Sequence, residues 1–137
     1  MKAKLICTAI FAATASFGAA AQTTAGCVAE LAFEPRLTII ADKVDVVRAN
    51  RGVQAPDRVA TTEEKDALRL WAHLRQECFE FGAKQRRASS KPQEIAFLRS
   101  VFVFQQRLVA DLQAGRVTYA EFKQRRGELV EAAGQEI

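Results

Sequence analysis

Three cysteines and one histidine carry the most reactive side-chain chemistry in this 137-residue chain. Cysteine forms disulfides or binds metals, and histidine binds metals or transfers protons. Cys27 and Cys78 lie 51 positions apart, Cys7 lies near the start, and His73 stands alone. No cysteines or histidines have the close spacing of a zinc site, and no serine lies in a nucleophile elbow that His73 would serve. We therefore expect no metal, no cofactor and no catalytic residue.

A second segment with possible chemistry runs from Gly115 to Phe122 and aligns with the back half of an EF-hand calcium loop. Gly115 falls on the turn glycine of that loop, and Glu121 falls on its bidentate acid. The front half lacks side-chain oxygens at its first three ligand positions, so we expect no calcium. A turn followed by a helix cap explains the same residues.

The first 21 residues have the order of regions found in a cleavable secretory signal. Lys2 and Lys4 precede an apolar run over 5–18, and three alanines follow it. The run, about 14 residues, is shorter than the roughly 20 needed to span a bilayer. We expect export to the periplasm or the cell exterior, with 22–137 as a mature chain without a transmembrane segment. The alternative is a buried first helix of a cytosolic protein.

Export decides how the cysteines are counted. Cleavage after residue 21 removes Cys7 and leaves Cys27 and Cys78 in an oxidising compartment, so we expect a disulfide between them. The alternative is a lipoprotein, because Thr24-Ala25-Gly26-Cys27 partly resembles a lipobox, whose cysteine is acylated. Leucine is usual where Thr24 stands, and acylation would leave Cys78 as a lone thiol. We therefore favour the disulfide.

Export also changes the charge of the mature protein. The whole chain has 20 basic and 16 acidic residues, and the loss of Lys2 and Lys4 leaves a net charge of +2. This balance gives no reason to expect nucleic acid as a partner. A candidate interaction patch remains where basic residues gather: Lys84, Arg86, Arg87 and Lys91. Such a patch can bind anionic lipid, an acidic protein or an anionic cell-wall polymer; the alternative is a solvated helix junction.

Apolar periodicity and helix-capping pairs predict an all-α fold, a small bundle of three to four helices with one disulfide. The 116 residues of 22–137 suit a single domain. Capping boxes are expected at Thr61 with Glu64, Ser90 with Gln93, and Thr118 with Glu121. The predicted helices cover about 35–47, 62–87, 91–114 and 119–133. Within 62–87, one apolar stripe is expected to face the core: Ala67, Trp71, Leu74, Cys78 and Phe81.

The helix predicted over 91–114 is apolar around most of its circumference, so it must be covered on more than one side. Either it is the central helix of the bundle, or it gives one face to a second subunit. The candidate apolar interface consists of Phe97, Val101, Phe102 and Phe104. For a homodimer, Phe97, Val101 and Phe104 form one possible face, and Phe102 with Val109 forms the opposite one.

Three segments, together with the signal and the two mature cysteines, resemble small exported bacterial helical proteins of unknown function. They are Glu34-Pro35-Arg36-Leu37, Leu70-Trp71-Ala72-His73-Leu74-Arg75-Gln76-Glu77-Cys78 and Gly115-Arg116-Val117-Thr118-Tyr119-Ala120-Glu121-Phe122. This resemblance covers most of the mature chain. It implies export and a helical fold, and it implies no activity.

We therefore expect a non-enzymatic binding or interaction protein of the periplasm, whose partner is a protein or an envelope component. Its sharper form is a chaperone-like helical hairpin of the stress-induced periplasmic type. The Leu-Thr-x-x-Gln motif of that family is matched only in part, by Ala60-Thr61-Thr62-Glu63-Glu64. The alternative is an inhibitor of a cell-envelope enzyme, or an envelope-acting enzyme without a recognisable catalytic motif.

Overall fold

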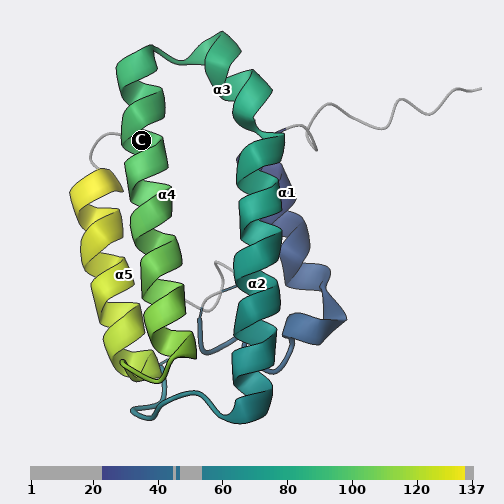
Figure 1. Cartoon of the computed structure of the whole chain (residues 1–137), viewed down its shortest axis with the longest axis vertical. Coiled ribbons are helices and arrows are strands. Elements are labelled where there is room, and N and C mark those ends of the chain that lie inside the picture. The colour runs from purple at the N-terminus through teal and green to yellow at the C-terminus, as the bar shows by residue number, and fades with distance from the viewer. Residues whose placement is uncertain (1–22, 45, 47–53, 135–137) are drawn as a thin grey trace, which may run out of the picture.

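The computed structural model of the chain describes residues 23–44, 46 and 54–134, and within these ranges it is helical with no strand (Figure 1). Its elements are α1 (Thr24–Glu30), the 3₁₀ helices η2 (Leu31–Phe33) and η3 (Pro35–Leu37), α2 (Thr62–Phe81), α3 (Ala83–Ser89), α4 (Pro92–Gln113) and α5 (Tyr119–Gly134). The all-α fold with one disulfide is confirmed, and the described ranges contain five α-helices in place of three to four. The expected signal, 1–21, lies outside the described residues.

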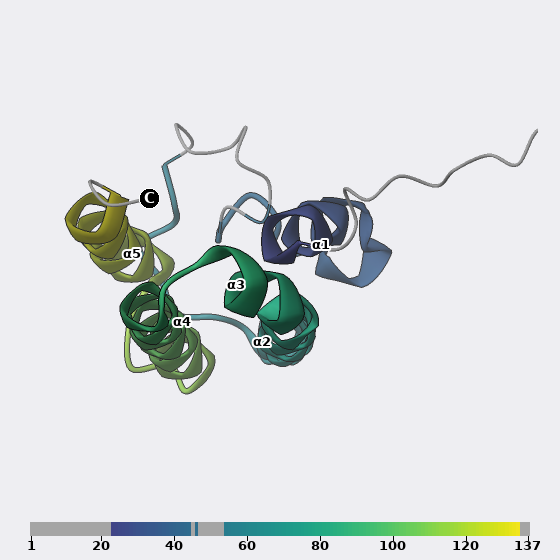
Figure 2. The same ribbon diagram turned by 90° about the horizontal axis from the view of Figure 1, so that it is seen from above.

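The long helices α2 and α4 run antiparallel and are joined at one end through the short helix α3 (Figure 1). Helix α1 packs against α2, and α5 packs antiparallel against α4. Seen from above, the four helices follow the order α5, α4, α2, α1 (Figure 2). We call residues 79–106, where α2 leads through α3 into α4, the hairpin end. We call the opposite part, residues 54–72 and 107–122, the closed end.

Two of the three expected capping boxes are confirmed, at the starts of α2 and α5. The Glu64 N–H donates to Thr61 Oγ1 at 3.3 Å, and the Thr61 N–H donates back to Glu64 Oε2 at 2.8 Å. Thr118 and Glu121 exchange the same pair of bonds at 3.2 and 2.8 Å. Gly115 has a φ of 72°, the left-handed conformation that glycine adopts after a helix ends.

The third expected box, Ser90 with Gln93, is wrong by one residue. Lys91 is the N-cap of α4, and its N–H donates to Glu94 Oε2 at 2.9 Å. This register places Pro92 at the first helical position, where a missing N–H costs nothing. It also uses a carboxylate, a stronger acceptor than the Gln93 amide.

The helix expected over 35–47 is not formed as one element. After η3, Ile40 and Lys43 donate backbone hydrogen bonds to Leu37 and Ile40 at 3.0 and 2.9 Å, three residues back, and the segment to Val44 consists of turns. These turns bury Leu37, Ile40 and Val44. Consecutive β-branched residues Thr38, Ile39 and Ile40 disfavour a regular helix here. Positions 45 and 47 lie outside the described residues.

The helix expected over 62–87 is divided at Gly82, which ends α2 and begins α3. A Cβ at Gly82 would lie 2.0 Å from Oγ1 of Thr24, so α1 packs directly on this glycine. Glycine also has the weakest helix propensity of all residues except proline. The contact with α1 and the low helix propensity of glycine together explain why the helix is interrupted at Gly82.

The core lies mainly toward the closed end and is formed by buried side chains of η2, η3, α2, α4, α5 and the segments 38–44 and 54–60. Helix α1 has no buried residue, but its Cys27 and Val28 pack against this core. The largest fully buried members of the core are Trp71, Tyr119, Phe122, Leu37, Ile40, Leu68, Leu112, Val44, Val109 and Cys78. Of the predicted α2 stripe, Ala67, Trp71 and Cys78 are buried and Leu74 is half-buried. Phe81 is wrong as a core residue, because 56% of it is exposed at the last position of α2.

A buried carboxylate joins the segments that meet at the closed end. Glu64 is 3% exposed and accepts from both terminal nitrogens of Arg58 at 2.7 Å each, in addition to its bond from Thr61. The Arg58 guanidinium and the N-cap hydrogen bond together lower the pKa of Glu64 to about 2. Burial and the adjacent Glu64 carboxylate raise the pKa of Tyr119, the first residue of α5.

None of the helices in the described ranges is both long and apolar enough to cross a membrane.

Candidate functional site

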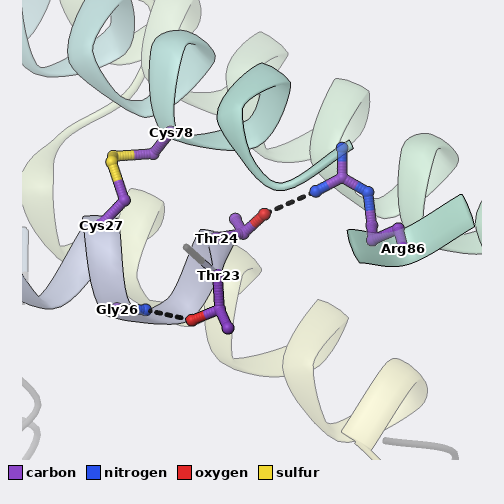
Figure 3. The surroundings of a disulfide bond; sticks show 6 residues. All are labelled: Thr23, Thr24, Gly26, Cys27, Cys78 and Arg86. Carbon is purple, nitrogen blue, oxygen red and sulfur yellow. Dashed lines mark hydrogen bonds between the residues drawn. A yellow bond between two sulfur atoms is a disulfide. The ribbon is translucent and has the colours of Figure 1, made fainter. Parts of the chain in front are cut away.

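The disulfide fixes α1 to the last turn of α2 (Figure 3). Cys27 and Cys78 are bonded with a Cα–Cα distance of 5.4 Å, as the even cysteine count predicts. The hydroxyl of Thr23 caps α1 by accepting from the Gly26 N–H at 2.9 Å. Of the two expectations for Cys27, the structure thus agrees with the disulfide.

One member of the predicted basic patch, Arg86, has a structural role. Its Nη1 donates to Thr24 Oγ1 at 2.5 Å (Figure 3). Its Nη2 donates to the Phe79 carbonyl, and its guanidinium lies 3.9 Å from the centroid of the Phe79 ring. Burial, with Arg99 and Arg87 nearby, lowers the pKa of Arg86. Arg86 therefore holds α3 against α1 and is not available to a partner, which corrects the prediction.

The other basic side chains of the patch point into solvent. Lys84, Arg87 and Lys91 are exposed, and so are Arg99 and Arg107 on α4. None of the five forms a salt bridge to any residue that the structure describes. Between Gly82 and Ala110 the one acid is Glu94, whose carboxylate caps α4. The positive charge of this region is therefore not compensated locally.

The predicted apolar interface is divided between the surface and the interior. Phe97 and Phe104 are 37% and 47% exposed, and Val101 is half-buried. Phe102 stacks on Phe79 with ring centroids 4.1 Å apart, and Val109 is fully buried. The set of Phe102 with Val109 is therefore wrong as a free dimer face, whereas Phe97 and Phe104 remain on the surface.

Sequence reasoning missed Val103, which is 42% exposed between Arg99 and Arg107. These three residues are four positions apart and share one stripe, and Phe97 and Phe104, seven apart, share the next one. At 100° per residue, all five fall within roughly half of the helix circumference. The helix thus presents cationic and apolar side chains side by side. We call the following set the α3–α4 surface: Lys84, Arg87, Lys91, Phe97, Arg99, Val103, Phe104 and Arg107.

This surface exists because the hairpin end is thinly covered. All residues from 79 to 106 are described, and the one buried residue among them is Gly82, which has no side chain. The predicted central helix is therefore central only in its last turns, where Leu108, Val109 and Leu112 are buried. Helix α4 packs against both α2 and α5, and several of its apolar side chains before Leu108 remain exposed: Phe97, Val103 and Phe104.

A second feature that sequence reasoning missed is a buried arginine beside this region. Arg75, 7% exposed, donates through Nη2 to Gln105 and lies 4.9 Å from the Trp71 ring centroid. Its Nη1 is buried with no hydrogen-bond partner among the described residues. Burial, aided by Arg126, lowers the pKa of Arg75 to about 10. The sequence could have predicted this burial, because Arg75 lies four positions after Trp71 and therefore on the same, core-facing side of α2.

The remaining chemical candidates lie on open surface. His73 Nε2 is 3.3 Å from Glu77 Oε1, with both side chains more than half exposed. A hollow of about 280 Å³ lies beside the disulfide, lined in part by Phe33, Leu74 and Glu77. A wider hollow of about 620 Å³ lies between Pro56 and Ala120. Among the described residues, no acids, cysteines or histidines cluster as metal ligands.

Comparison with known proteins finds no matching family model, no matching curated protein and no matching solved structure, so the functional assignment rests on the α3–α4 surface and its chemistry.

Proposed function

We propose that this chain is an exported, non-enzymatic binding protein that engages an anionic partner through the α3–α4 surface. One observation carries the proposal: no side chain of α4 before Leu108 is buried, and the unpaired Arg99 and Arg107 lie among its exposed apolar residues. Neither property helps the isolated fold, whereas both favour association with a partner of opposite charge.

The apolar component supplies the binding free energy that charge alone does not. Full burial of a phenylalanine side chain contributes about 2 kcal/mol, and Phe97 and Phe104 retain 37% and 47% of their exposure. Covering both of them together with Val103 would therefore contribute about 2 kcal/mol. The five cations add attraction that depends on ionic strength and accelerates encounter.

The remaining polar features support binding in preference to catalysis. His73 and Glu77 form a solvated pair on an exposed helix face, where water competes with any proton transfer. The buried ionic groups Glu64 and Arg75 serve the fold, since Glu64 joins segments and Arg75 stacks on the core tryptophan. We therefore assign the catalytic step of an envelope enzyme to none of these residues.

A chaperone-like role is the sharper version of this proposal, since the exposed phenylalanines suit apolar segments of unfolded clients. Inhibition of an envelope enzyme is the other version, in which the partner is a folded protein with an acidic surface. Both versions predict dependence on the α3–α4 surface.

The test is a pull-down from envelope extract with three forms of residues 22–137. These are wild type, a triple variant (Arg87→Glu, Arg99→Glu, Arg107→Glu) and Arg125→Glu, an exposed charge reversal on α5. Arg86 stays unchanged because it holds α1. We expect wild type and Arg125→Glu to retain the same components, with retention falling as NaCl rises, and the triple variant to lose them. Identical retention by all three would refute the proposal.

A further inference from the structure

We infer that the anionic partner of the α3–α4 surface is a phospholipid membrane with anionic headgroups, to which the protein adsorbs without crossing it. The inference rests on the proposed function and names the partner. Its grounds are the shape of the surface, the order of charges along α4 and the repulsion between two copies.

The shape of the surface suits a deformable partner. The α3–α4 surface is formed by the outside of α4 and by α3, and the two hollows described above are lined by other residues. A folded protein or peptide usually anchors a side chain in a pocket of its partner. The headgroup region of a membrane needs no pocket, because exposed apolar side chains insert into it directly.

The order of charges along α4 favours lipid over a folded acidic protein. Arg99 and Arg107 flank Val103 at four residues on either side, and Phe97 and Phe104 lie on the adjoining stripe. A protein partner would need an acid in register with each arginine, since an unpaired charge in an interface is costly. Lipid phosphates move laterally to meet cations wherever they fall. Long arginine stems also let the guanidinium stay among headgroups while the phenylalanines insert.

A second copy of the chain is a poor occupant of the same surface. Two α3–α4 surfaces facing each other would bring five unpaired cations from each copy within about a Debye length, roughly 8 Å at physiological salt. Glu94 is the single acid between Gly82 and Ala110, and it is engaged in capping α4. Like charges at this density oppose the apolar attraction between the copies. An anionic membrane attracts the same five cations.

The test uses residues 22–137, which include every described residue, and sedimentation with vesicles. One set contains phosphatidylcholine with one quarter phosphatidylglycerol, and the other contains phosphatidylcholine alone. We expect binding to the anionic vesicles, at least tenfold weaker binding to the neutral ones, and loss of binding as NaCl is raised from 50 to 500 mM. Each lysine or arginine near an anionic surface is worth about fivefold in affinity.

The variants separate the two components of the surface. The triple variant Arg87→Glu, Arg99→Glu, Arg107→Glu should bind anionic vesicles at least a hundredfold more weakly, and Arg125→Glu should bind within threefold of wild type. Phe97→Ser with Phe104→Ser should weaken binding at least fivefold with the salt dependence retained. Circular dichroism checks that each variant is folded. We expect all of them to fold, because the four changed positions of α4 are exposed.

Three results would overturn the inference. The first is no binding to anionic vesicles at 50 mM NaCl. If the pull-down from envelope extract still yields components that the triple variant loses, the proposed function stands, but the partner is not lipid. The second is vesicle binding that the triple variant keeps, which would place the lipid contact elsewhere. The third is a dimer in sedimentation that the Phe97→Ser, Phe104→Ser pair dissociates, which would make a second copy the occupant. Failure of both vesicles and pull-down would refute both proposals.

Discussion

The two ends of the bundle hold their buried charges in different ways. At the closed end, Glu64 has an arginine partner, a backbone N–H donor and a lysine 3.6 Å away. Toward the hairpin end, Arg75 has one amide partner and one buried nitrogen without a partner among the described residues. A buried ion stabilises a fold only when its bonds replace those it made with water.

The same contrast holds for the apolar side chains. Phe122 at the closed end is 1% exposed and meets Trp71 edge to face, with ring centroids 6.3 Å apart. Phe104 on α4 is nearly half exposed. The closed end therefore holds the fold together, and the hairpin end contributes fewer buried side chains to it. Four predictions test this division, from the largest expected effect to the smallest.

Replacing Phe122 with alanine should have the largest effect on stability. Truncation of a fully buried phenylalanine removes its contacts and leaves a cavity, so we expect a loss of about 4 kcal/mol. Phe104→Ala, the same change at the hairpin end, should cost less than about 1 kcal/mol. Urea unfolding followed by circular dichroism measures both. Equal losses would show that the hairpin end is as important to stability as the closed end.

Opening the disulfide should have the next largest effect. In the chain-entropy model, closing a loop over 51 positions stabilises the fold by up to about 4 kcal/mol. We expect Cys27→Ser with Cys78→Ser to lower the free energy of unfolding by about 3 kcal/mol. The control is wild type in reducing agent, which should reach the same stability as the double variant. A double variant as stable as the oxidised protein would mean that α1 is held by Arg86 and packing alone.

Acid should remove the contribution of Glu64. Its pKa in the folded protein, about 2, lies below the ordinary 4.5, so the carboxylate stabilises the fold above pH 4.5. That stability, about 3 kcal/mol for a shift of this size, is lost as the pH falls from about 4.5 to 2. Glu64→Gln should show the loss already at pH 7, and its stability should converge with wild type near pH 2. The exposed neighbour Glu63→Gln should follow wild type throughout; a matching loss there would contradict a special role for Glu64.

Removing the Arg75 charge should have the smallest effect, with the opposite sign. Methionine keeps the contact with Trp71 and removes a guanidinium with an unpartnered nitrogen, so we expect Arg75→Met to stabilise the fold by about 1 kcal/mol. The change Arg69→Met, on the exposed side of α2, should leave stability within about 0.5 kcal/mol. Thermal unfolding compares the three proteins. Destabilisation by Arg75→Met would mean that the stacking on Trp71 outweighs the desolvation of the charge.

Much of the fold could be predicted because its signals are local. The caps at Thr61 and Thr118, the turn at Gly115 and the buried face of α2 each depend on residues within a few positions of one another. The disulfide could be predicted because an exported chain cleaved after residue 21 keeps only two cysteines. These features need no knowledge of how the helices pack.

The remaining features depend on contacts between distant segments. The break at Gly82 and the role of Arg86 both need Thr24, which lies 62 positions before Arg86. Phe102 is not free for the predicted interface, because its ring stacks on Phe79 of α2. Val103 was overlooked because its exposure follows from the thin cover of the hairpin end. The patch and its exposed cations Lys84, Arg87 and Lys91 were predictable, whereas the structural role of Arg86 depends on a distant contact.

The position of the disulfide also has a consequence for the order in which the protein is assembled. Both cysteines lie in the first 78 residues, so a chain that crosses a membrane amino end first delivers them before α3, α4 and α5. The bond can therefore form around α1 and α2 while the second half of the protein is still in transit. Helices α3, α4 and α5 of such a chain would then fold against a covalently fixed pair of helices.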